Sequence, residues 1–218
     1  MTIIKKIIRS IITKCFPELN VLAEDINWAY LKNTRDRNTV GQHVIVYSPC
    51  HVNDTIIGDY SYISYNSWIS MTKIGKFCSI GPNVVCGWGI HPTDGISTSP
   101  SFYSLTPPNN KTFANNNKIK ERKDIFIGND VFIGANVTIL DGITIGDGAV
   151  IGAGAVVSKN IPPFAVAVGC PIEIKGYRFP SDQIEALKHI KWWEFDEDKL
   201  KDVEQYFFDL NSFIEKYR

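Results

Sequence analysis

The sequence predicts an all-β solenoid of short parallel strands, and three observations support this prediction. An aliphatic residue, usually followed by glycine, recurs every six residues at Ile127, Ile133, Ile139, Ile145, Ile151 and Val157. The fourth residue after each one is small or aliphatic: Val131, Val137, Ile143, Ala149, Ala155 and Ile161. Apolar residues make up 44% of the 218 residues and charged residues 21%, as in a soluble globular protein. A period of six is neither helical nor a simple alternation, and it is typical of triangular coils that stack through their inner faces.

An earlier block carries the same repeat at Ile57, Ile63, Ile69, Ile74, Ile80 and Cys86. The repeat slips by one residue between Ile69 and Ile74. Weaker turns begin at Ile45 and His51, which brings the stack to about five coils. We expect each inward residue to stack on its equivalent about 18 positions along the chain. The same phase predicts that Cys78 and Cys86 are core residues.

Three segments lie outside the repeat. The predicted solenoid, residues 45–178, is interrupted by residues 89–124, and an excursion of this length is uncommon unless it is functional. Residues 1–44 are predicted to be an amphipathic helix and a lead-in. Its isoleucine stripe packs on its own core or on a neighbouring subunit, or its basic face lies on a membrane. Residues 179–218 are predicted to be helical, with apolar faces that cap the open end of the coils or pack on a neighbour.

The composition excludes several classes of protein. Lys plus Arg and Asp plus Glu both number 23, so zero net charge argues against a surface for nucleic acid. The five cysteines form no C-x-x-C pair and no cluster at zinc spacing, which predicts reduced thiols and no metal. No apolar run approaches the length of a membrane span. We therefore expect a cytoplasmic protein, with residues 1–16 as a candidate contact to the inner face of the membrane.

Several segments resemble a known family. They are IGKFCSIGP at 74–82, GIHPTD at 89–94, IGNDVFIG at 127–134, IGDGAVIGAG at 145–154, SKNIPP at 158–163 and IKWWEF at 190–195. They are similar to the hexapeptide-repeat acyltransferases, in particular to the xenobiotic or chloramphenicol-type branch, and most like its surface-sugar O-acetyltransferases. The resemblance implies a left-handed parallel β-helix, a homotrimer, and acetyl-CoA as co-substrate between adjacent prisms.

Acetyl transfer from a thioester to a hydroxyl needs a base for the hydroxyl proton, and histidine suits this role near neutral pH. His91 opens the excursion directly after a coil, and it matches the catalytic histidine of the family. The other histidines, His43, His51 and His189, are predicted to be structural. Asp94 either orients the loop, binds the acceptor or makes a turn. The buried cysteines are not needed as nucleophiles, so we expect direct transfer from CoA to the acceptor.

The resemblance also implies a set of binding residues. Ala135, Ala153, Ser158 and Lys159 match the coil edge that holds CoA, while Lys175 and Arg178 are candidates on charge alone. Trp88 is either an aromatic wall for a sugar or a packing residue at the coil edge. Many relatives have Trp where this chain has Phe132, which leaves the shape of the acceptor pocket open.

These residues favour an O-acetyltransferase that acts on a sugar of a surface polysaccharide (O-antigen or capsule) or its lipid-linked precursor. The excursion is rich in hydroxyl and aromatic groups, which suit sugars. Alternatives are an antibiotic acetyltransferase of the streptogramin or chloramphenicol type and an N-acetyltransferase for an amino sugar nucleotide. From other classes come a γ-type carbonic anhydrase, which needs three converging histidines, and a solenoid without catalytic activity.

Overall fold

The computed structural model describes residues 14–15 and 34–218. The strands of the first coils are β1 (Thr34–Asp36), β2 (Thr39–Val40), β3 (Ile45–Val46), β4 (His51–Asn53), β5 (Ile56–Ile57), β6 (Tyr62–Ile63), β7 (Trp68–Ser70), β8 (Thr72–Ile74), β9 (Ser79–Ile80) and β10 (Val85–Cys86). The later strands are β11 (Ile125–Ile127), β12 (Phe132–Ile133), β13 (Thr138–Ile139), β14 (Thr144–Ile145), β15 (Val150–Ile151), β16 (Val156–Val157), β17 (Ala165–Val168) and β18 (Glu173–Tyr177). The helices are η1 (Pro100–Phe102), α3 (Ser181–Ile190), η2 (Trp192–Glu194), α4 (Glu197–Gln205) and α5 (Leu210–Tyr217).

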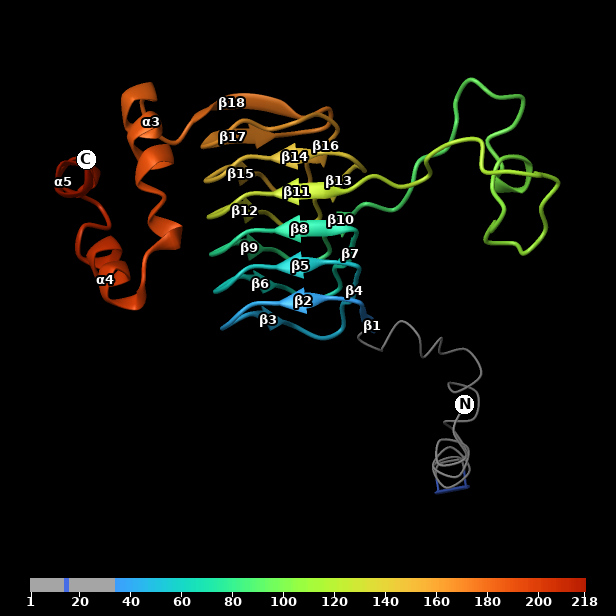
Figure 1. The fold of residues 1–218 in the computed structure, drawn as a ribbon, viewed down its shortest axis with the longest axis horizontal. Helices are drawn as coiled ribbons and strands as arrows, with labels where there is room; N and C mark the ends of the chain where they lie inside the picture. The colour runs from blue at the N-terminus through green and yellow to red at the C-terminus, as the bar shows by residue number, and fades with distance from the viewer. Residues whose placement is uncertain (1–13, 16–33) are drawn as a thin grey trace.

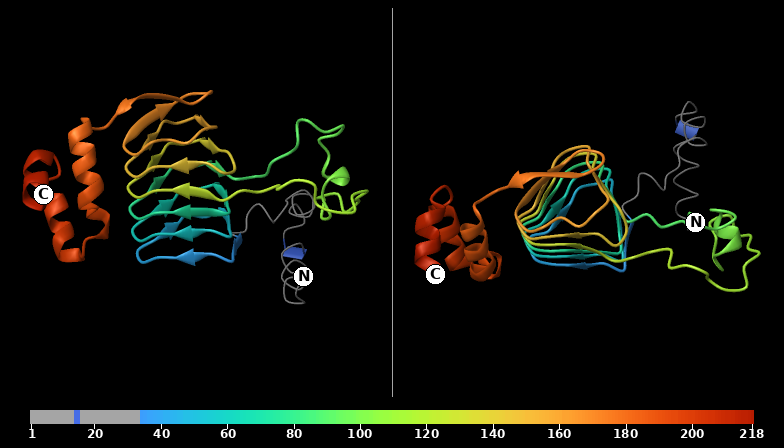
Figure 2. Two further views of the ribbon diagram at one scale, coloured as in Figure 1. Left: turned by 45° about the horizontal axis from the view of Figure 1, so that its top comes forward. Right: turned by 90° about the horizontal axis from the view of Figure 1, so that it is seen from above.

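The strands form the three faces of a triangular prism (Figure 2). Face A holds six strands in the order β1-β4-β7-β10-β13-β16, face B holds β14-β11-β8-β5-β2, and face C holds β18-β17-β15-β12-β9-β6-β3. Each coil gives one strand to each face, so pairing is parallel except for β18, which runs antiparallel to β17. The predicted solenoid is confirmed, and its fold is the left-handed parallel β-helix.

The inward aliphatic residues form columns through the prism. On face C, Ile63 pairs with Ile80, Ile80 with Ile133 and Ile133 with Ile151, and all four are fully buried. Burial of each such side chain is worth about 1.5–3 kcal/mol relative to exposure. A coil cannot bury these side chains alone, so the stack as a whole provides the core.

The first coils differ from the prediction in extent and in phase. Strands β1 and β2 precede residue 45, so the solenoid includes a coil that lacks the clear repeat. In the weak turns the inward residues are Val46 and Val52, because they align with Ile63 and Ile69 one coil along. Ile45, which we predicted to point inward, is 52% exposed.

The one-residue slip seen in the sequence belongs to one corner, which we call corner AB because its turns join face A to face B. In the early coils Ile57 aligns with Ile74, an offset of 17 residues, whereas Ile127 aligns with Ile145 later, an offset of 18. The early turns at this corner are tight, and Met71 there has a φ of 49°. The interruption predicted at residues 89–124 falls between β10 on face A and β11 on face B, at this same corner.

The C-terminal helices are present, but they lie beside the prism instead of over its end (Figures 1 and 2). They pack on corner BC, which joins face B to face C. There the ring of Phe77 lies 5.0 Å from that of Trp192, and Lys76 Nζ lies 2.9 Å from the carboxylate of Glu194. The side chains of Phe164 and Trp193 are buried in this cluster. The helices therefore stabilise several coils along their edge.

The predicted N-terminal amphipathic helix within residues 1–16, and most of the lead-in up to residue 44, lie outside the described residues. Among residues 14–15 and 34–218, no helix is long and apolar enough to cross a membrane.

Candidate active site

The excursion loop leaves the prism at corner AB and projects away from it, on the side opposite the C-terminal helices (Figure 1). Its two ends run side by side as a stem, in which the Ile90 amide donates to the Glu121 carbonyl at 2.8 Å. His91 follows directly on the outgoing strand of this stem. The local fold of the stem therefore determines where His91 lies relative to the prism.

Asp141 holds the stem from the next coil. Its side chain is only 2% exposed, and its carboxylate accepts hydrogen bonds from the amides of Gly89 (2.8 Å) and Lys123 (3.1 Å). The Nε of Arg122 lies 3.2 Å from the same carboxylate, and its Nη2 donates to the Gly87 carbonyl at 2.5 Å. One buried carboxylate thus joins both strands of the stem to the prism. Hydrogen bonds to a charged acceptor are stronger than neutral ones.

The imidazole of His91 is exposed but held at one nitrogen. Its Nδ1 lies 2.9 Å from the Thr98 carbonyl oxygen and 2.8 Å from the Tyr103 hydroxyl. A carbonyl oxygen only accepts hydrogen bonds, so contact with it favours the tautomer in which Nδ1 carries the proton. The lone pair then resides on Nε2. In this arrangement His91 can accept a proton from a hydroxyl group.

Tyr103 belongs to a small core that the loop forms by itself. Its side chain is 4% exposed, and its carbonyl accepts from the Lys118 amide at 2.9 Å. The neighbouring Ser104 is fully buried, and its carbonyl accepts from the Thr112 hydroxyl at 2.7 Å. Burial of the Tyr103 hydroxyl, together with the negative charge of Glu121, raises its pKa, so the hydroxyl keeps its proton at neutral pH.

Sequence reasoning identified His91 but missed Thr98, Tyr103, Asp141 and Arg122. His91 stands out because it follows the last coil before the break in the repeat. Tyr103 and Asp141 reach the stem from 12 and 52 residues away respectively, counted to His91 and Gly89. The signal for Asp141 is weak, an acidic residue in the corner turn next to the excursion.

The predicted acceptor residues separate into two groups. Trp88 lies in the stem, is 53% exposed and meets Trp68 edge to face at 5.2 Å between centroids. Trp68 in turn stacks on the buried ring of His51 at 3.8 Å, so aromatic rings line face A next to the stem. Asp94 is exposed in the loop, three residues after His91. Phe132, by contrast, lies on face C, away from corner AB in the same chain.

The predicted CoA residues mostly border face A. Ala135 and Ala153 occupy successive turns at corner CA, which joins face C to face A, and a Cβ on Gly134 would lie only 2.5 Å from the Ala153 nitrogen. Ser158 and Lys159 are exposed and follow β16 at corner AB, the corner from which the excursion departs. The structure therefore brings both pairs to the two edges of one face.

Lys175 and Arg178 are placed differently. Lys175 lies on β18 of face C and forms an ion pair with Glu173 at 2.5 Å. Arg178 donates to Asp130 at 2.8 Å and to the Gly148 carbonyl at 2.9 Å. These bonds give Arg178 a structural role at corner BC.

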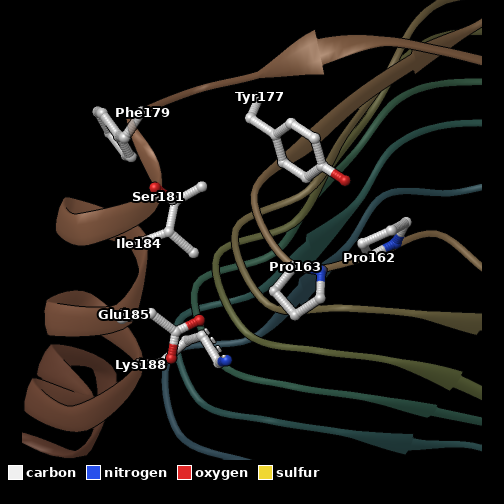
Figure 3. A pocket seen from close by; sticks show the side chains of 8 residues that line it. All are labelled: Pro162, Pro163, Tyr177, Phe179, Ser181, Ile184, Glu185 and Lys188. Atoms are coloured by element: carbon white, nitrogen blue, oxygen red, sulfur yellow. Dashed lines mark hydrogen bonds and ion pairs between the residues drawn. The ribbon is translucent and has the colours of Figure 1, made fainter.

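Two surface hollows also lie at corner BC. The larger, of about 280 Å³, lies between the turn at Pro162 and Pro163 and helix α3, where Ile184 and the ion pair of Glu185 with Lys188 face it (Figure 3). The smaller, of about 220 Å³, is lined by Phe77, Ser79, Asp130, Val131, Phe132, Val150 and Arg178. Corner BC and the excursion loop lie on opposite sides of the prism, so neither hollow adjoins His91 in the same chain (Figure 1). Within residues 14–15 and 34–218, no group of three or more His, Cys, Asp or Glu side chains is placed to hold a metal ion.

Residues 124–159 match the sequence profile of the bacterial transferase hexapeptide family (six repeats). The solved structure of a maltose O-acetyltransferase from Clostridium difficile 630 is 30% identical with a TM-score of 0.52, over 65% of this chain and 70% of that one. The chain belongs to the hexapeptide-repeat acyltransferases. A hexapeptide-repeat acetyltransferase from Vibrio cholerae is 27% identical with a TM-score of 0.53, over 65% of this chain and 74% of that one.

This hexapeptide-repeat acyltransferase is also similar to curated chloramphenicol acetyltransferases. The protein from Agrobacterium fabrum is 40% identical over 131 residues, which are 59% of this chain and 62% of that protein. The protein from Morganella morganii is 37% identical over 132 residues, which are 59% of this chain and 61% of that protein. The chain thus spans about three fifths of the length of the curated relatives it matches.

Proposed function

We propose that this chain is an acetyl-CoA-dependent O-acetyltransferase in which His91 is the general base. The acceptor that we propose is a sugar hydroxyl of a surface polysaccharide, O-antigen or capsule, or of its precursor. One observation carries the catalytic part: the Nδ1 of His91 lies 2.9 Å from the Thr98 carbonyl, which leaves Nε2 as the proton acceptor.

In this reaction Nε2 of His91 takes the proton of the acceptor hydroxyl while the oxygen attacks the thioester carbonyl carbon. The C–S bond then breaks, and the imidazolium returns the proton to the departing CoA thiolate. The products are an acetyl ester and CoA, and His91 is regenerated. Ala135, Ala153, Ser158 and Lys159 are the residues that we propose for CoA, since they lie on the two edges of face A.

The rings next to the stem support a sugar acceptor. Trp88 is half exposed, and apolar ring faces suit the C–H surfaces of sugars. The likeness to a maltose O-acetyltransferase favours the same class. The likeness to chloramphenicol acetyltransferases favours a second candidate, an antibiotic acceptor for the same chemistry. The third candidate, N-acetylation of an amino sugar nucleotide, differs only in the acceptor group.

We also propose that the protein works as a homotrimer in the cytoplasm, with residues 1–16 as a contact to the membrane. The excursion loop supports assembly, because it projects from the prism with exposed apolar side chains. Phe102 and Phe113 stack at 5.4 Å and are 47% and 69% exposed. A neighbouring prism would cover them.

The test is a thiol-release assay with acetyl-CoA and separate panels of sugars, amino sugar nucleotides, chloramphenicol and a streptogramin. We expect turnover with a sugar hydroxyl, and a loss of about 10²- to 10⁴-fold in kcat for His91→Asn, the usual contribution of a general base. His189→Asn, on the exposed side of α3, is the matched control and should retain the wild-type rate. Wild-type kcat in His91→Asn would refute the assignment of the base. Turnover confined to the drugs or the amines would refute the sugar.

A further inference from the structure

We propose that Tyr103 is a positioning residue that, together with the Thr98 carbonyl, fixes the ring of His91. This inference rests on the proposed function, because it concerns how the proposed base is held. The Tyr103 hydroxyl lies 2.8 Å from Nδ1, and the two rings meet edge to face at 88°. Tyr103 does not contact the reacting atoms. It acts through the orientation and the protonation of His91.

The direction of the hydrogen bonds follows from the Thr98 carbonyl. If Tyr103 donated to Nδ1, the lone pair of Nδ1 would also face the carbonyl oxygen at 2.9 Å, and the two would repel each other. With the proton on Nδ1, both oxygens can accept from it in a three-centre bond. Both also stabilise the positive charge that the ring acquires when Nε2 takes a proton. The hydroxyl therefore favours the catalytic tautomer and the charged ring together.

The support for this hydroxyl is rigid, whereas the segment around Thr98 is exposed. Tyr103 is 4% exposed and is bonded through its own backbone to Pro100 (3.2 Å) and Lys118 (2.9 Å). Thr98 lies in the outer part of the loop, where most side chains from 93 to 98 are exposed. Tyr103 thus links the base to the folded core of the loop. Without the hydroxyl, only the carbonyl of the exposed segment would hold the ring.

The experiment uses Tyr103→Phe in the full chain, which removes the hydroxyl and keeps the ring. We expect kcat to fall about tenfold with KM values for acetyl-CoA and acceptor within about twofold, the loss expected for one neutral hydrogen bond that matters in the transition state. Tyr65→Phe is the matched control, because its ring packs on Tyr47 in the first coils and should leave kcat unchanged. Thermal melting checks that both variants fold like wild type.

A nitrogen-15 NMR spectrum of the His91 ring gives a readout that simple loop packing would not move. We expect a single neutral tautomer in the wild type, with the proton on Nδ1, and a mixture of tautomers in Tyr103→Phe. A wild-type ring protonated on Nε2 would overturn the inference without any variant. So would wild-type kcat and an unchanged tautomer in Tyr103→Phe. The proposed function fails separately, through wild-type kcat in His91→Asn.

Discussion

The carboxylate of Asp141 should decide whether the loop stem stays closed. In Asp141→Asn the side chain loses its charge and one of its two acceptor oxygens. The wild-type carboxylate accepts from Gly89, Lys123 and Arg122 at 2.8–3.2 Å and is 2% exposed. Hydrogen bonds to a charged group are worth about 1.5–3 kcal/mol each. The partial exposure of Arg122 (33%) reduces its share.

We therefore expect the free energy of opening the stem to fall by about 2–3 kcal/mol. This corresponds to about 30- to 150-fold less protection of the Gly89 and Lys123 amides in hydrogen exchange. Both amides donate directly to Asp141, so nitrogen-15 NMR exchange on these two residues is the assay. Asp124→Asn, an exposed acidic residue next to the stem, is the control with the same change of charge.

Arg122→Gln completes a double-mutant cycle. The ion pair predicts a coupling of at least about 1 kcal/mol between the two substitutions, because each variant alone already loses the pair. Additive effects would show that Asp141 acts through the amides alone. Unchanged protection of both amides in Asp141→Asn would refute the reasoning for the whole stem.

Two further predictions concern the prism. Gly148 and Gly154 both have left-handed φ values, 67° and 71°, but a Cβ on Gly148 would lie 2.4 Å from the Phe164 ring, whereas one on Gly154 meets nothing within 4 Å. In urea denaturation Gly154→Ala should cost about 1–2 kcal/mol and Gly148→Ala about 1–3 kcal/mol more; equal costs would contradict the packing. Burial raises the pKa of Cys78 and of Cys86 to about 12, so both thiols stay protonated at pH values well below 12. A thiol reagent in native buffer at about pH 8 should label exposed Cys170 quickly and these two only after denaturation, as read by peptide mass spectrometry; rapid native labelling of Cys86 would refute its burial.

The fold could be predicted from the sequence because the core is written as a repeat. Each inward residue has an equivalent at a fixed distance along the chain, and the pattern needs no knowledge of distant contacts. The repeat was ambiguous where two apolar residues adjoin, as at Ile45 and Val46. There only the alignment of Val46 with Ile63 decides which residue points inward. The position of the C-terminal helices was also beyond the sequence, because an apolar helix face does not say which surface it meets.

The candidate site divides along the same line. His91 was accessible because it lies where the repeat ends, and the turn residues were accessible through motifs. Thr98 contributes only a backbone carbonyl, which no residue type reveals. Tyr103 and Asp141 are single polar residues whose partners are distant in the chain, so periodicity carries no information about them.

The difference between 17- and 18-residue coils limits which changes of length the chain tolerates. Before the excursion, His51 aligns with Trp68 and Val52 with Ile69. Deletion of residues 51–67 would therefore bring Trp68 to the place of His51 with every later strand still in register. Removal of 18 residues from the same coil would turn each inward side chain of the following coil outward. Beyond the excursion the counting changes, since Ile133 aligns with Ile151. Insertions and deletions of whole coils should thus come in units of 17 residues on one side of the loop and 18 on the other.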